Sequence, residues 1–170
     1  MTEKKKNLSE VSNEQIGDVS NSKIAIVKSK WNPEITNALN DACVATMLTH
    51  GVKKENIVEH QVPGSFELPA GAQIAASKNN LDAIICIGCV ITGETKHDEY
   101  ISNAVAMGCM QLGLGLKMPV IFGLLTPRTM EQAIARAGGE HGNKGVEAAI
   151  TALEMITLQK GSFGKQKVGF

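Results

Sequence analysis

One segment of the chain limits the possible folds more than any other. Residues 83–90 have the sequence Ala-Ile-Ile-Cys-Ile-Gly-Cys-Val, an uninterrupted apolar run of strand length. A strand with one face in water alternates polar and apolar side chains, whereas a strand buried on both faces does not. We therefore expect residues 83–90 to form a central strand of a sheet that helices cover on both faces.

Segments with the features of strands and helices alternate along the rest of the chain. Short apolar runs predict strands at residues 23–27 and 119–124, and residues 57–61 are predicted to form a further short strand. Helices are predicted over Pro33 to about His50, Pro69–Ser77, about His97 to Leu116, a segment starting at Thr129, and about Asn143 to Leu158. This order predicts an α/β fold with a four-stranded parallel sheet and right-handed crossovers, a flavodoxin-like three-layer αβα sandwich.

Local signals support two of the predicted helix starts. Asn32 precedes Pro33, and an Asn N-cap followed by Pro at the first helical position is a favoured start. Thr129 and Gln132 have the spacing of a capping box. We therefore predict that Asn32 and Thr129 cap the helices that follow them.

Both ends of the chain depart from this regular pattern. Residues 1–22 are polar, rich in Asn, Ser, Glu and Lys, and without periodicity, which predicts a flexible N-terminal arm. Residues 159–170 are predicted to form a polar C-terminal tail. The domain is therefore expected to span residues 23–158.

The charge and the cysteines argue against several classes of partner. The 17 basic residues balance 17 acidic ones, so no net charge draws the chain to nucleic acid or to an anionic membrane. No apolar run approaches the length of a membrane span, and no secretory signal precedes the cysteines. We expect a reduced, cytoplasmic protein that acts on small molecules. The low aromatic content, 4%, beside wide apolar helices favours self-association.

Cys86 and Cys89 have the Cys-x-x-Cys spacing of a redox pair or of half a metal site. Such redox pairs open a helix, whereas these two cysteines lie within a predicted strand, where alternate side chains point to opposite faces. A second pair of ligands is also missing from the sequence. We therefore interpret both cysteines as small core residues and expect no metal.

Unusual side chains gather where the predicted strands end. Ligands of parallel α/β sheets bind beyond the carboxyl ends of the strands, which here are residues 29–32, 62–67, 91–97 and 124–126. These segments carry a Trp, a Pro-Gly loop with a following Glu, and a Gly-x-Thr-x-His sequence. This edge of the sheet is therefore the predicted binding site.

Each of these groups also has a purely structural interpretation. Trp31 could pack on the surface or stack on a ligand ring, and Glu67 could be solvated or could accept hydrogen bonds from ligand hydroxyls. His97 could be polar surface, or a proton donor and acceptor. Residues 93–97 lead from a strand into a helix, where free N–H groups can receive a phosphate. The residues by themselves leave these alternatives open.

Five stretches of the sequence resemble a known family. They are Lys30-Trp31-Asn32, residues 62–69, the Gly93-x-Thr95-x-His97 segment, residues 119–123, and residues 131–138 with the following Gly142-Asn143-Lys144-Gly145. Over about residues 23–158 the chain resembles the lumazine synthase family. The resemblance implies a transferase of riboflavin biosynthesis, which condenses 5-amino-6-(D-ribitylamino)uracil with 3,4-dihydroxy-2-butanone 4-phosphate to give 6,7-dimethyl-8-ribityllumazine.

The resemblance also implies roles for individual residues. His97 is the expected catalytic proton donor and acceptor, and Trp31 stands where the family usually has a Phe that stacks on the pyrimidine ring. The other residues expected around the pyrimidine and its ribityl chain are Asn32, Ser65, Phe66, Glu67, Cys89, Val90, Ile91 and, from a neighbouring subunit, Phe122. The residues expected around the phosphate are Glu94, Thr95, Arg136 and Lys144.

Several positions depart from the family pattern. Thr92 stands where many relatives carry Arg, and Glu94 stands where they carry a small residue. A carboxylate close to a phosphate is unfavourable unless it points away. Glu140 and His141 replace a more usual Lys-Ala, and the sequence indicates no role for them.

The resemblance implies a homo-oligomer whose site is shared between adjacent subunits. The family forms pentamers, some of which close into icosahedral capsids of sixty subunits, and association with riboflavin synthase is a further implied partnership. No cofactor is implied. A non-catalytic lumazine- or flavin-binding relative and a mainly shell-forming protein remain alternatives. An FMN-carrying flavodoxin is disfavoured, because residues 29–33 are not a phosphate loop rich in Ser, Thr and Gly.

Overall fold

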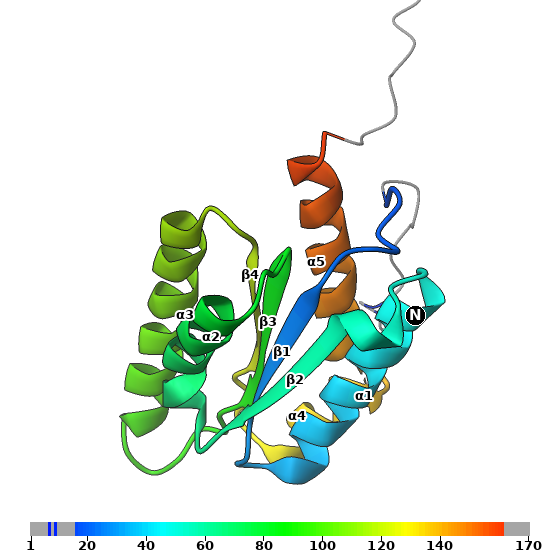
Figure 1. The fold of residues 1–170 in the computed structure, drawn as a ribbon. Coiled ribbons are helices and arrows are strands. Elements are labelled where there is room, and N and C mark those ends of the chain that lie inside the picture. Colours follow the sequence, from blue (N-terminus) through cyan, green and yellow to red (C-terminus); the bar gives the residue numbers. More distant parts are fainter. Residues whose placement is uncertain (1–6, 8, 10–15, 162–170) are drawn as a thin grey trace, which may run out of the picture.

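The computed structural model describes residues 7, 9 and 16–161, and a four-stranded sheet forms its centre (Figure 1). The strands are β1 (Ile24–Ser29), β2 (Ile57–Val62), β3 (Ala83–Cys89) and β4 (Val120–Leu125). All neighbouring strands are parallel, in the order β2-β1-β3-β4. The predicted parallel sheet is therefore confirmed, and β3 lies in its interior as expected.

Two pairs of helices cover the two faces of the sheet (Figure 1). The helices are α1 (Pro33–Thr49), α2 (Leu68–Lys78), α3 (His97–Leu116), α4 (Met130–Ala135) and α5 (Lys144–Gln159), with single 3₁₀ turns η1 (Lys54–Asn56) and η2 (Ser65–Glu67). Helices α2 and α3 pack on one face, and α1 and α5 pack on the other. This is the expected three-layer αβα arrangement of a flavodoxin-like fold. No described helix has both the length and the apolar character of a membrane span.

The side chains of β3 divide between two hydrophobic cores. Ile85, Ile87 and Cys89 belong to the core beneath α1 and α5, whereas Ile84 and Cys86 belong to the core beneath α2 and α3. Cys86 and Cys89 therefore point to opposite faces, as their position in a strand predicted. Within the described part of the chain, no group of three or more His, Cys, Asp or Glu could hold a metal ion.

The predicted side-chain cap at Asn32 is wrong. Asn32 has a left-handed backbone, with φ 53°, and its side chain makes no capping hydrogen bond to α1. Its Nδ2 instead donates to the carbonyl oxygen of Cys89 at 2.9 Å, so the side chain joins the ends of β1 and β3. Thr129 does cap α4, because its Oγ1 accepts from Gln132 N–H at 3.3 Å. The Gln132 side chain accepts from Arg128 N–H and not from Thr129, so the capping box is incomplete.

A short hairpin that the sequence did not predict connects α4 to α5. Its strands, β5 (Ala137–Gly139) and β6 (Gly142–Asn143), pair antiparallel. Gly138 and Gly142 have φ values of 110° and 83°, in the left-handed region that favours glycine. The hairpin therefore depends on its glycines, and not on an alternation of apolar side chains that sequence analysis could detect.

The last residues of the expected N-terminal arm pack against the domain. Val19 and Ser22 are buried, and Gly17 N–H donates to Thr157 Oγ1 of α5 at 3.1 Å. The packed part of the chain therefore begins before the expected boundary at residue 23. Most of the arm upstream of residue 16, and the tail beyond residue 161, lie outside the described residues, and their flexibility stays a prediction.

Candidate active site

Most of the expected site residues line one pocket, which lies at the carboxyl ends of β1 and β3 and beside the loop after β2. Its volume is about 630 Å³. The lining residues are Trp31, Asn32, Gly64, Ser65, Phe66, Glu67, Cys89, Val90, Ile91, His97, Tyr100 and Ile101. Except for Phe122, the topology therefore brings together the residues expected around the pyrimidine and its ribityl chain, and it places His97 beside them.

Three exposed aromatic side chains surround this pocket. Trp31, Phe66 and Tyr100 have exposed fractions of 71%, 61% and 72%. A Cβ atom added at Gly64 would lie 3.5 Å from Trp31 Cδ1, so the loop after β2 approaches the indole closely. Aromatic faces that the protein itself leaves uncovered can stack on a planar ligand.

The loop after β2 holds the Glu67 carboxylate at the pocket. Glu67 Oε2 accepts a hydrogen bond from Gly64 N–H at 2.9 Å. Ser65, in the same turn, is buried, and its Oγ lies 3.5 Å from Ser29 Oγ at the end of β1. This anchored carboxylate can accept hydrogen bonds from ligand hydroxyl groups.

Residues 89–91 form the apolar side of the pocket. The carbonyl oxygen of Cys89 already accepts from Asn32, and Val90 N–H donates to the Leu125 carbonyl at 2.8 Å. Backbone recognition of a heterocycle can therefore use the second lone pair of the Cys89 oxygen, the Val90 carbonyl oxygen or the groups of Ile91. Burial raises the pKa of the Cys89 thiol to about 11, so this side chain is neutral at pH 7.

His97 begins α3 at the edge of the pocket. Its side chain is exposed, and its backbone N–H donates to Thr95 Oγ1 at 3.4 Å. Lys96, at the N-cap position, makes no side-chain cap, so first-turn N–H groups of α3 remain for an anion. Glu94 and Thr95 are exposed in the preceding loop but do not line the pocket.

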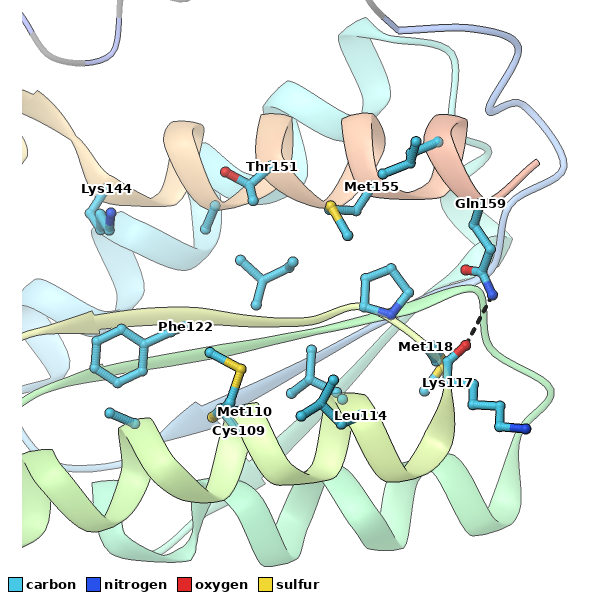
Figure 2. Close-up of a pocket in the computed structure, with 17 residues that line it drawn as sticks. Cys109, Met110, Leu114, Lys117, Met118, Phe122, Lys144, Thr151, Met155 and Gln159 are labelled. Carbon is cyan, nitrogen blue, oxygen red and sulfur yellow. Dashed lines mark hydrogen bonds between the residues drawn. The ribbon is translucent and has the colours of Figure 1, made fainter. Parts of the chain in front are cut away.

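Besides Glu94 and Thr95, three expected site residues lie outside this pocket. Phe122 and Lys144 line a groove of about 660 Å³ between α3, β4 and α5, whose walls include Met110 and Leu114 (Figure 2). Arg136 lines a separate depression of about 560 Å³. Within a single chain, the structure therefore separates the two expected phosphate-binding cations from the pocket of Trp31.

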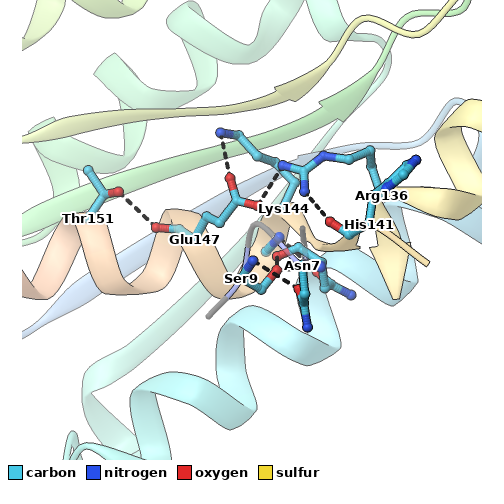
Figure 3. A network of polar contacts seen from close by, with 9 residues as sticks. Asn7, Ser9, Arg136, His141, Lys144, Glu147 and Thr151 are labelled. Atoms are coloured by element: carbon cyan, nitrogen blue, oxygen red, sulfur yellow. Dashed lines mark hydrogen bonds and ion pairs between the residues drawn. The ribbon is translucent and has the colours of Figure 1, made fainter. Parts of the chain in front are cut away.

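One carboxylate joins these two cations (Figure 3). Glu147 Oε1 lies 2.5 Å from Arg136 Nη2, and Glu147 Oε2 lies 3.2 Å from Lys144 Nζ. Arg136 Nη1 also donates to the carbonyl oxygen of His141 at 2.6 Å. With 19% of its side chain exposed, Arg136 is a paired, half-buried side chain and not a solvated helix charge.

Comparison with known proteins decides the family. The family model described as 6,7-dimethyl-8-ribityllumazine synthase matches residues 21–160. This chain belongs to that family. A 6,7-dimethyl-8-ribityllumazine synthase of Cytophaga hutchinsonii is 51% identical over 92% of this chain and 98% of its own length. Proteins with the same description from Parabacteroides distasonis and Bacteroides fragilis are 47% and 53% identical, over 89% and 79% of this chain and 95% and 94% of their own lengths.

Membership of the 6,7-dimethyl-8-ribityllumazine synthase family confirms the resemblance that the strand-end motifs indicated. The matched range runs from before β1 to the end of α5 and includes every expected site residue. The roles of the individual residues stay predictions.

Three residues that lie next to the expected site residues were not predicted from the sequence. Tyr100 and Ile101 line the pocket one helical turn after His97, and Glu147 contacts the cations one turn after Lys144. Residues three or four apart on a helix share a face. That spacing, applied to the predicted helices, would have identified all three.

Proposed function

We propose that this chain catalyses the condensation of 5-amino-6-(D-ribitylamino)uracil with 3,4-dihydroxy-2-butanone 4-phosphate to 6,7-dimethyl-8-ribityllumazine, with release of phosphate and water. The observation that carries the proposal is the strand-end pocket of a lumazine synthase family member, in which Trp31, Glu67 and His97 meet. An exposed indole offers a stacking face for the heterocycle, and the anchored carboxylate offers an acceptor for the ribityl hydroxyls.

The chemistry requires proton transfers and no change of oxidation state overall. The pyrimidine amine attacks the ketone and loses water to form an imine, phosphate is then eliminated, and the ribitylamino nitrogen closes the ring with loss of a second water. His97 lies at the edge of the pocket, where it can donate and accept these protons. Holding two polar substrates in contact contributes more than any single acid or base, so His97 assists a reaction that positioning dominates.

The charge of the pocket supports a site shared between two copies of the chain. Among the residues that the structure describes, no Lys or Arg lines it, although one substrate carries a phosphate that cationic side chains would stabilise. Arg136 and Lys144 would supply this charge from a neighbouring subunit, and Phe122 would close the pyrimidine pocket from the same side. The exposed apolar side chains of Met110 and Leu114 in the groove beside Phe122 favour burial against another copy. We propose a homopentamer, alone or as part of a larger shell.

The test uses the full chain and both substrates. Lumazine and released phosphate are measured together by chromatography and phosphate assay, with each substrate alone as the control, and light scattering gives the size of the active species. Product formation by a pentamer or a multiple of it is expected. Binding of lumazine without turnover would identify a non-catalytic relative, and an active monomer would contradict the shared site. Co-elution with riboflavin synthase tests that further association.

A further inference from the structure

Glu147 lies in the first turn of α5 and contacts both cations of the expected phosphate site. Each of its two carboxylate oxygens accepts from a different cation, Oε1 from Arg136 Nη2 and Oε2 from Lys144 Nζ. Glu147 and Arg136 are well covered, with 17% and 19% of their side chains exposed. Because a carboxylate is planar and rigid, its two oxygens fix the separation of the two cations.

Backbone contacts hold the same cluster from the other side. Arg136 Nη1 donates to the His141 carbonyl in the turn between β5 and β6. Lys144 N–H donates to the Arg136 carbonyl at 2.9 Å. The cluster therefore joins the hairpin to α5 and places both cationic groups on one rigid junction (Figure 3).

We propose that Glu147 is a positioning residue for phosphate binding: its carboxylate holds Arg136 and Lys144 at a fixed separation and orientation before the phosphate substrate arrives. This inference rests on the proposed function. Arg and Lys have long side chains that lose rotamer freedom when they bind a ligand. Two adjacent cations also repel each other and turn apart if no anion lies between them. Glu147 reduces both costs in advance.

A simpler role for Glu147 gives the opposite result. If the carboxylate only neutralised the two cations, it would compete with the phosphate, and its removal would raise the local positive charge and strengthen phosphate binding. If Glu147 positions the cations, its removal weakens phosphate binding although the local charge becomes more positive. The sign of the effect therefore separates the two roles.

The test compares Glu147→Gln with Glu154→Gln in the full chain. Glu154 lies two turns farther along α5, outside the cluster, so its substitution makes the same chemical change without touching Arg136 or Lys144. Glu147→Gln is expected to raise KM for the dihydroxybutanone phosphate by about tenfold, the worth of one charge-assisted hydrogen bond. KM for the pyrimidine stays within about twofold, and Glu154→Gln changes neither constant. An unchanged or lower KM for the phosphate substrate would overturn the proposal.

Glu147→Asp provides the second variant, because it keeps the negative charge but withdraws both oxygens by one methylene. Positioning predicts a raised KM for the phosphate substrate, whereas neutralisation predicts no change. Inorganic phosphate, used as a competing inhibitor, is expected to bind both Glu147 variants more weakly than the parent chain. Unaltered inhibition would contradict the inference. If the parent chain forms no lumazine, the proposed function fails, which is distinct from a parent chain that turns over while its Glu147 variants keep the same KM.

Discussion

Trp31→Ala tests whether the pocket binds its ligand by stacking. The indole is 71% exposed, so its loss removes little packing and should change the free energy of unfolding by less than about 0.5 kcal/mol, as at other surface positions. A ligand ring stacked on it would lose roughly 1 to 3 kcal/mol of binding free energy. That loss corresponds to an increase of about 5- to 150-fold in the Kd for the lumazine. Trp31→Phe is the control and should be nearly neutral, because ring area carries the contact.

Fluorescence provides the assay, since Trp31 is the only Trp in the chain. A lumazine in contact with the indole offers paths for energy and electron transfer, so titration of the folded protein should quench the emission. Kd values from this quenching are compared with values from calorimetry, which also reports on the variants that lack a Trp. Unchanged emission together with calorimetric binding would remove Trp31 from the site. A large loss of folding stability in Trp31→Ala would show instead that the indole packs mainly against protein.

Three further predictions concern the site and its supports. Arg136→Ala should raise KM for the phosphate substrate far more than KM for the pyrimidine, whereas His97→Ala should lower kcat by about a hundredfold at most. Steady-state kinetics with each substrate varied in turn measures these constants, and an Arg136→Ala variant with unchanged KM for the phosphate substrate would contradict the assignment. Burial raises the pKa of the Cys89 thiol from 9.0 to about 11, so at pH 8 about one molecule in a thousand should carry the thiolate. Alkylation of Cys89 should therefore be slow in the folded protein and fast in denaturant, and equal rates in both would refute the burial of this thiol. Asn32→Ala should cost about 1 to 2 kcal/mol of folding stability, and Asn32→Gly should cost less, because glycine adopts the left-handed backbone at φ 53° without strain. Denaturant titration measures both losses of stability, and equal losses would assign the cost to the Cys89 contact alone.

The helices and strands were predicted well where the hydrophobic periodicity agreed with the start and stop signals at their ends. The helix expected from about His97 to Leu116 has those bounds in the structure, and the apolar run at residues 83–90 forms the buried β3. Agreement was poorer where a side chain had two possible partners. Asn32 has the sequence context of a helix cap, but the carbonyl of Cys89, 57 residues away, takes its amide. Only the assembled sheet determines which partner the amide takes.

The candidate site likewise contains residues whose position follows from local sequence signals and residues whose position depends on long-range contacts. Trp31, Glu67 and His97 follow separate strands, and a parallel sheet brings such strand ends to one edge, so the sequence was enough to predict that they meet. Arg136 and Lys144 belong to no strand end of the central sheet. Their positions depend on a hairpin set by Gly138 and Gly142.

Because Arg136 and Lys144 lie outside the pocket of Trp31, the two substrates should depend differently on assembly. A monomer would present an aromatic, carboxylate-bearing pocket that no described Lys or Arg lines. Its cation pair, already compensated by Glu147, would lie elsewhere on the surface. The pocket alone can stack a neutral heterocycle, but for a phosphate it offers only the first-turn N–H groups of α3. If a neighbouring copy supplies Arg136 and Lys144, pyrimidine binding needs mainly the one chain, whereas phosphate binding needs the assembly. Dilution to monomers should then weaken phosphate binding before it weakens stacking on Trp31.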